Sequence, residues 1–163
     1  MPIGLLKDIA NEAPIQGTFL GLDVGQKTIG LALGGRMLGV ATPLETIKRT
    51  KFTKDMQALI KIAKEHEVDG YIVGLPVSMD GTEGRRSQSI RDFAAEMNRF
   101  LKEQGEADPF IAFWDERLST VSVDSVVDNF VEKRKTKINA KASGLIDKLA
   151  AQLILQGALD YLA

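Results

Sequence analysis

Asp23 is the residue of this chain whose surroundings point most directly to chemistry. It interrupts an apolar stretch, and glycines at positions 21 and 25 leave the space around it open. An isolated buried carboxylate is costly to ionise, so it normally has a partner such as a metal ion, a cation or several hydrogen-bond donors. A strand, a glycine turn and a second apolar strand would present this acid at the edge of an active site. The alternative interpretation is that Asp23 only caps the turn.

Two further carboxylates stand in comparable contexts. Asp115 and Glu116 close an apolar run that begins at Phe110. Because successive strand residues point to opposite faces, we expect only one of the two acids at a shared site. We favour Glu116 and keep Asp115 in reserve, although an acid that pairs with Arg117 explains the spacing equally well. Asp147 is expected in the first turn of the last helix, where the helix dipole alone also favours an acid.

The three acids Asp23, Glu116 and Asp147 together predict a site for a hard divalent cation. The chain has no cysteine and a single histidine, so carboxylate oxygens are the available ligands. Such oxygens suit Mg²⁺ or Mn²⁺. Two of these ions about 3.5–4 Å apart can activate a water and stabilise the leaving oxygen of a phosphodiester without a protein nucleophile. This hypothesis requires the three side chains to converge on one pocket.

Composition sets the broad class of the protein. A chain of 163 residues is long enough for one domain with a substantial core. Its net charge of −1 gives no global electrostatic argument for nucleic acid, and no apolar run approaches membrane-spanning length. The absence of cysteine fits a reducing compartment. We expect an N-terminal extension over residues 1–17, without a secretory signal and with at most one short helix, and a single domain over residues 18–163.

The order of the expected elements predicts an α/β fold. Glycine turns join three apolar stretches that should pair as antiparallel strands. Two later strands are reached through helices and should be parallel. This gives a five-stranded mixed sheet with helices on both faces. The expected strands are 19–24, 28–33, about 37–46, 71–75 and 110–114, and the expected helices are 53–66, 86–104, 120–131 and 144–162.

Four motifs of this chain, in this order, resemble those of one family. They are Gly21–Gly25 with Ile29–Ala32, Val73–Pro76 with Met79–Gly84, Asp115–Thr120, and Asp147–Ala151 with Ile154–Gln156. Each motif is weak alone, but their order is specific, and the resemblance extends from Phe19 to Leu162. The family is the YqgF-type one, described as pre-16S rRNA nucleases and as Holliday-junction-resolvase-like proteins.

The resemblance implies a ribonuclease H-like fold and an endonuclease that depends on Mg²⁺ or Mn²⁺. It also implies a cytoplasmic location, a role in maturing the 5′ end of the 16S rRNA precursor, and an association with the ribosome or its assembly intermediates. The family's catalytic and metal-binding acids fall on Asp23, Glu116 and Asp147. Two departures bear on substrate contacts: Thr28 stands where the family commonly has arginine, and Gly34–Gly35 where it often has an acid. Lys27 is the nearest basic replacement.

Positive charge gathers in parts of the chain. Residues 133–141 include five basic and no acidic residues and directly precede the helix that carries Asp147. We expect them beside the site, where phosphates need positive charge, with a solvated loop as the alternative. The loop before residue 86 can offer a phosphate its backbone N–H groups and two arginines. A cluster over residues 48–54 is interpreted as ordinary surface. The expected contacts to nucleic acid are Lys27, Arg85, Arg86, Arg117, Lys133, Arg134, Lys135, Lys137 and Lys141.

Three other functions stay open at this point. Residues 23–32 also resemble the first phosphate motif of ATP-handling proteins of the actin and sugar-kinase type, but those bind nucleotide between two domains and this chain has material for one. A second alternative is a catalytically silent RNA-binding or ribosome-associated module. Within the nuclease hypothesis we rank an rRNA precursor first and branched DNA second. Symmetrical cleavage of a Holliday junction in recombination or repair would require a dimer with two sites.

Overall fold

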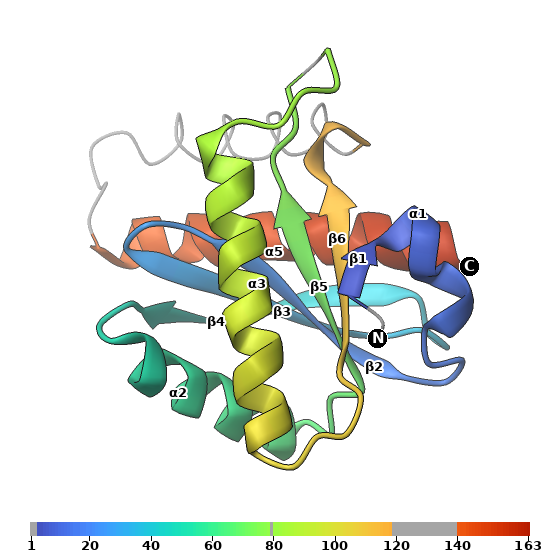
Figure 1. Cartoon of the computed structure of the whole chain (residues 1–163), viewed down its shortest axis with the longest axis horizontal. Helices are drawn as coiled ribbons and strands as arrows, with labels where there is room; N and C mark the ends of the chain where they lie inside the picture. The colour runs from blue at the N-terminus through green and yellow to red at the C-terminus, as the bar shows by residue number, and fades with distance from the viewer. Residues whose placement is uncertain (1–2, 79, 119–139) are drawn as a thin grey trace.

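A single mixed sheet organises the computed structural model, which describes residues 3–78, 80–118 and 140–163, with side chains in the last range from residue 144 (Figure 1). Its strands follow the order β1-β6-β5-β2-β3-β4. No helix within these ranges is long and apolar enough to cross a membrane. The elements are β1 (Ile3–Leu5), α1 (Leu6–Ile9), η1 (Ala10–Glu12), β2 (Thr18–Val24), β3 (Thr28–Gly35), β4 (Val40–Lys48), α2 (Phe52–Glu65), β5 (Gly70–Leu75), α3 (Arg85–Glu103), β6 (Phe110–Asp115), η2 (Glu116–Leu118) and α5 (Ala140–Leu162).

The sheet combines both pairing modes, as predicted. The hairpin strands β2, β3 and β4 are antiparallel, whereas β5 pairs parallel with both β2 and β6. Parallel strands end at the same edge of a sheet, so the carboxyl ends of β2, β5 and β6 lie together. This is the edge at which open α/β sheets bind ligands.

The expectation of five strands is wrong, because a sixth strand comes from the N-terminal extension. Ile3–Leu5 pair in parallel with Ile111–Phe113 at the edge of the sheet. A strand of three residues is too short to show the alternation that reveals longer strands. Its partner strand β6 orders it, and the next residue, Leu6, is fully buried. The short helix expected in the extension is α1.

The sheet separates two apolar cores, and helices cover both faces as predicted. Leu20, Leu22 and Val24 of β2 belong to the core beneath α2 and α3. Phe19, on the opposite face of the same strand, belongs to the core formed with α5 and α1. Figure 1 shows α3 in front of the sheet and α5 behind it. The period-two alternation of β2 therefore assigns each of its side chains to one of the two layers.

Two element boundaries differ from the expected ones by three residues or more. Helix α5 begins at Ala140 instead of near residue 144, so Asp147 lies about two turns inside the helix. The dipole of a first turn therefore does not explain Asp147. Strand β4 begins at Val40 instead of near residue 37, because Gly39 adopts a φ of 70° and forms the turn. The helix expected over residues 120–131 lies outside the described residues.

Candidate active site

Asp23 lies near the carboxyl end of β2 and points to the face that α5 covers. Gly21, two residues earlier on the same face, contacts this helix: a Cβ at Gly21 would lie 2.7 Å from the Cβ of Leu155. Strand alternation then places Asp23 on the same side. Gly30 pairs directly with Asp23 in the antiparallel ladder and shares that face.

Helix α5 brings Asp147 to the same place. A Cβ at Gly30 would overlap the main-chain oxygen of Asp147, so this close approach requires glycine. The Asp147 carboxylate accepts a hydrogen bond from the hydroxyl of Thr28 in β3. One turn earlier, the Thr46 hydroxyl donates a hydrogen bond of 2.6 Å to the main-chain oxygen of Gly144. Strands β3 and β4 therefore fix the position of Asp147 beside Asp23.

Glu116 approaches Asp23 from the β5 side of β2, whereas Asp147 lies over β3. Strand β6 ends at Asp115, and Glu116 begins the short turn η2. A Cβ at Gly74 would lie 2.7 Å from Oε1 of Glu116 and would overlap Ile154 of α5. The Glu116 carboxylate therefore lies over β5, on the α5 side. Since β5 pairs with β2, this places Glu116 toward Asp23.

The electrostatics show that the three acids form one cluster. Burial raises the pKa of Asp23 from 3.8 to about 6; the charge of Asp147 adds to the increase and that of Arg86 opposes it. Burial also raises the pKa of Glu116 from 4.5 to about 7; the charge of Asp23 adds to this increase, and Arg86 again opposes it. Asp23 thus interacts with both other acids, and Arg86 faces two of the three. The cluster carries more negative charge than Arg86 can balance.

The chemistry and location of this cluster fit a hard divalent cation. Its donors are carboxylate oxygens, which Mg²⁺ and Mn²⁺ prefer. Within the described residues, no three His, Cys, Asp or Glu side chains already form a metal-ligand group. Mg²⁺ does not need one, because it keeps several waters and binds through one or two carboxylates together with substrate phosphates. Asp23 and Glu116, both half-buried, are the pair that can supply those carboxylates.

Asp115, the reserve candidate, belongs to a different interaction. Arg117 donates hydrogen bonds to its carboxylate from Nη2 at 2.6 Å and from the main-chain nitrogen at 2.9 Å. Burial acts to raise the pKa of Asp115, but these hydrogen bonds outweigh it and hold the pKa below its usual range. The geometry therefore favours Glu116 over Asp115. It also shows that the Arg117 guanidinium, an expected contact to nucleic acid, is engaged within the protein.

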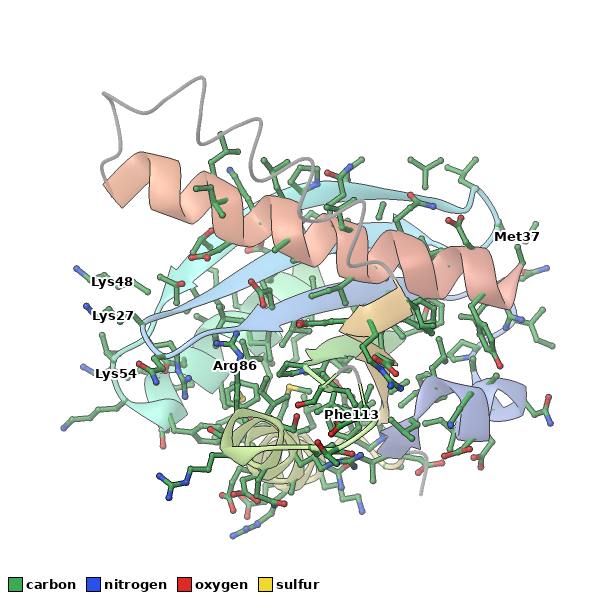
Figure 2. The ribbon with its side chains drawn as sticks, turned by 90° about the horizontal axis from the view of Figure 1, so that it is seen from above. Lys27, Met37, Lys48, Lys54, Arg86 and Phe113 are labelled. Atoms are coloured by element: carbon green, nitrogen blue, oxygen red, sulfur yellow. The ribbon has the colours of Figure 1, made fainter. Side chains whose placement is uncertain are left out.

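The other expected nucleic-acid contacts differ in how far the structure places them. Arg85 and Arg86 open α3, and Lys27 is exposed in the β2–β3 turn. Figure 2 shows Lys27 and Arg86 toward one end of the molecule, together with Lys48 and Lys54, while Met37 lies at the other end. Of the basic stretch before α5, Lys133, Arg134, Lys135 and Lys137 lie outside the described residues, and Lys141 is described only by its backbone.

Sequence reasoning missed two residues of this region. The family resemblance marks Thr28 only as a departure from the usual arginine, yet its hydroxyl donates a hydrogen bond to the Asp147 carboxylate. The sequence predicts ordinary surface for Arg49, yet its Nη1 donates a hydrogen bond of 2.5 Å to the main-chain oxygen of Gly25. Neither has a sequence signal of its own. A threonine in a strand and an arginine in a basic stretch are common, and only the pairing of β3 with β4 brings them to the site.

Comparison with known proteins identifies the family. The family model of RuvX, described as "Holliday junction resolvase", matches residues 17–161. The chain belongs to the RuvX family. A relative from Rhodospirillum centenum is 45% identical over 99% of this chain and 83% of its own length, and one from Ruegeria pomeroyi is 45% identical over 96% and 95%. Both carry the name "Putative pre-16S rRNA nuclease".

Solved structures share the fold of this RuvX protein. RuvC of T. thermophilus in complex with a Holliday junction substrate matches with a TM-score of 0.53 and 15% identity, over 85% of this chain and 91% of its own. The yeast mitochondrial Holliday junction resolvase Ydc2 matches with a TM-score of 0.52 and 13% identity, over 96% of this chain and 84% of its own. These similarities confirm the predicted ribonuclease H-like fold. The predicted family and enzyme class, a nuclease, are confirmed as well, and the family implies a nucleic-acid substrate and a divalent metal.

Proposed function

We propose that this RuvX protein is an endonuclease that uses Mg²⁺ or Mn²⁺ to hydrolyse phosphodiester bonds at the 5′ end of the 16S rRNA precursor. One observation carries the proposal: a half-buried cluster of carboxylates at the carboxyl edge of the sheet, in which Asp23 interacts with both Glu116 and Asp147. The names of the relatives support rRNA as the substrate. We also propose that the protein works in the cytoplasm, on the ribosome or its assembly intermediates.

Each residue of the cluster has a distinct part in this proposal. Asp23 and Glu116 hold the cation, and Asp147 completes the negative centre from α5 in the orientation set by Thr28. When bound, the divalent ion supplies an activated water and stabilises the leaving oxygen. Arg86 offsets part of the charge of the acids and attracts a phosphate toward them. Strand β2, the turn η2 and helix α5 hold the three acids on separate elements, so the packed core fixes their spacing.

The same proposal defines the extent of the nuclease domain and the residues that contact the substrate backbone. Residues 18–163 form the nuclease domain, and residues 1–17 are an extension whose strand β1 protects the edge of β6. Lys27, Arg85 and Arg86 contact the substrate backbone close to the acids. The basic residues from Lys133 to Lys141 are proposed to extend this contact along the nucleic acid.

A cleavage assay with a matched variant tests the function. A labelled fragment of rRNA precursor and a labelled four-way DNA junction are incubated with purified protein in Mn²⁺. We expect Asp23→Asn to reduce cleavage by more than the roughly 10–100-fold that loss of a supporting residue causes. Asp108→Asn removes an exposed loop acid before β6 and should leave the rate unchanged. Equal cleavage by Asp23→Asn and the wild-type protein would contradict the assignment.

The family description favours a second candidate substrate, the Holliday junction. The same assay distinguishes the two substrates, because it presents RNA and junction to one preparation. Cleavage of the junction in preference to RNA, by an assembly with two sites, would replace the first proposal. Binding of RNA without cleavage of either substrate in Mn²⁺ would indicate a catalytically silent RNA-binding module.

A further inference from the structure

We propose that a pocket beside the acidic cluster is a subsite for one backbone phosphate that flanks the bond to be cut, an inference that rests on the proposed nuclease function. The pocket lies between the β2–β3 turn and the first turn of α3. It encloses about 380 Å³. It is lined by Val24, Gly25, Gln26, Arg49, Arg85, Arg86, Ser89 and Ile90.

The charge of this pocket is unbalanced. Three of its lining residues are arginines and none is acidic. In the described part of the chain, the side chains of Arg85 and Arg86, in the first turn of α3, form no hydrogen bond or ion pair with another residue. By contrast, three other arginines in or near α3 each pair with an acid. These pairs are Arg91 with Glu83, Arg99 with Glu96, and Arg117 with Asp115.

Arg49 lines the pocket between the β2–β3 turn and α3. Its guanidinium donates to the main-chain oxygen of Gly25 and lies 5.4 Å from the ring centroid of Phe93. Its main-chain nitrogen donates a hydrogen bond of 2.8 Å to the oxygen of Lys27. A guanidinium has five N–H donors, so the bond to Gly25 leaves several for a phosphate, whose oxygens match this planar group.

The pocket is connected rigidly to the acidic cluster. Val24 and Gly25, which line it, directly follow Asp23 in the chain. Arg86 lines the pocket, and its charge also acts on Asp23 and Glu116. The buried Ser87 hydroxyl donates to the main-chain oxygen of Pro76, which ties the first turn of α3 to the end of β5. A strand bound at the acids therefore has a neighbouring phosphate at the arginines.

This geometry assigns the pocket to substrate binding more than to the chemical step. The ligand is the pair of nonbridging oxygens of the flanking phosphate. Their contact with the arginines is the same before and during cleavage. Loss of such uniform binding raises KM and leaves kcat unchanged. Loss of an acid at the centre has the opposite signature, because it lowers kcat.

Binding of a short single-stranded RNA in EDTA, where no cleavage occurs, tests the pocket directly. We expect Arg85→Gln to weaken binding about tenfold, as for loss of a charge-assisted hydrogen bond. The slope of log K against log salt should become shallower by about 0.7, the value for one phosphate contact to a single strand. Arg85→Lys keeps the charge but lacks the planar guanidinium, so its affinity for the RNA should also fall several-fold. Lys102→Gln, an exposed residue in the last turn of α3, is the charge control and should change neither quantity.

The outcomes separate this inference from the nuclease proposal. If Arg85→Lys binds like the wild-type protein and Arg85→Gln binds like Lys102→Gln, the pocket holds no phosphate, whatever the nuclease activity. If the pocket variants lose binding as expected but the wild-type protein cuts neither substrate in Mn²⁺, the nuclease proposal fails and the phosphate site stands. Arg85 is exposed, so Arg85→Gln should fold normally. Arg49→Lys gives a second variant, at the arginine between the β2–β3 turn and α3, with the same expected loss of RNA affinity.

Discussion

Asp23 and Glu116 hold their protons unusually tightly, chiefly because burial disfavours the charged form of each. The pKa of Asp23 rises from 3.8 to about 6 and that of Glu116 from 4.5 to about 7. A folded-state pKa above the unfolded value means that the folded chain binds the proton more tightly. The resulting stabilisation is complete below about pH 4 and is lost as the pH rises through about 6 for Asp23 and about 7 for Glu116. Without metal, the ionised cluster therefore destabilises the fold at alkaline pH.

Asp23→Asn should relieve this destabilisation. At about pH 8 in EDTA we expect the variant to have a free energy of unfolding about 2–3 kcal/mol higher than the wild-type protein, since each unit of pKa shift corresponds to about 1.4 kcal/mol. At about pH 3, below the unfolded pKa of 3.8, the two should be nearly equal, because the acid is then largely protonated in both folded and unfolded states. Urea unfolding across this range measures the difference.

The control and a metal titration complete this test. Asp108→Asn, which removes a carboxylate from an exposed loop, should change the free energy of unfolding at about pH 8 by no more than about 0.5 kcal/mol. Added Mg²⁺ should stabilise the wild-type protein, because an ion that binds only the folded state shifts the equilibrium toward it. Mg²⁺ should raise the free energy of unfolding of Asp23→Asn by less than that of the wild-type protein. A difference between variant and wild type that is constant with pH would contradict the burial of an ionisable Asp23.

At the scale of elements, the position of Asp147 depends on how closely α5 lies against β3. The main chain of α5 passes directly over Gly30, and the added Cβ of an alanine would overlap the main-chain oxygen of Asp147. Because the obstacle is backbone and not the end of a flexible side chain, the helix has to move. Such overpacking costs about 1–3 kcal/mol.

Gly30→Ala should therefore lower the free energy of unfolding by about that amount and also reduce cleavage, because Asp147 moves with the helix. Gly35→Ala is the matched control: it changes a glycine of the same strand whose Cβ would meet no atom within 4 Å. It should leave stability and cleavage nearly unchanged. Urea unfolding and cleavage rates in Mn²⁺ measure both effects. Full activity of a destabilised Gly30→Ala protein would show that Asp147 is not needed at its observed position.

Elements with a strong local pattern could be predicted from sequence, and those set by contacts could not. The alternation in β2 and the glycine turns gave the hairpin strands and the mixed sheet. Strand β1 has only three residues and exists because β6 offers it an edge. The start of α5 was misjudged because Gly144 resembles a boundary, whereas the helix runs through it from Ala140.

The same distinction holds for the candidate site. The three acids could be proposed from their motifs, and the structure brings Asp23 together with Glu116 and Asp147. The hydrogen bond from Thr28 to Asp147 joins residues 119 positions apart, and no spacing rule predicts it. Arg49 reaches Gly25 only because of the register of the sheet. Supporting contacts of this kind depend on tertiary packing, which a single sequence does not display.

At the scale of the whole molecule, Arg36 joins both ends of the described chain to the sheet. It directly follows β3, whose last residue Gly35 pairs with Thr18 at the start of β2, so it lies at the opposite end of β2 from Asp23. Its Nη1 donates to the main-chain oxygen of Pro14 at 3.2 Å, and its Nη2 to that of Leu162 at 3.2 Å. Its main-chain nitrogen donates to the oxygen of Gly17 at 3.0 Å. One side chain thus connects the N-terminal extension with the last turn of α5.

Arg36→Met should remove these side-chain hydrogen bonds while keeping an unbranched apolar stem. We expect the free energy of unfolding to fall by about 1–3 kcal/mol, the range for a hydrogen-bonded charged group whose partners lose their donor. Hydrogen exchange should increase at residues 13–17 and in the last turn of α5, whereas RNA cleavage below the unfolding transition should be unchanged because the acids lie at the other end. Arg99→Met, which loses only an exposed pair with Glu96, should change stability by less than about 1 kcal/mol. Increased exchange around Asp23 in Arg36→Met would instead show that the two ends of the sheet open together.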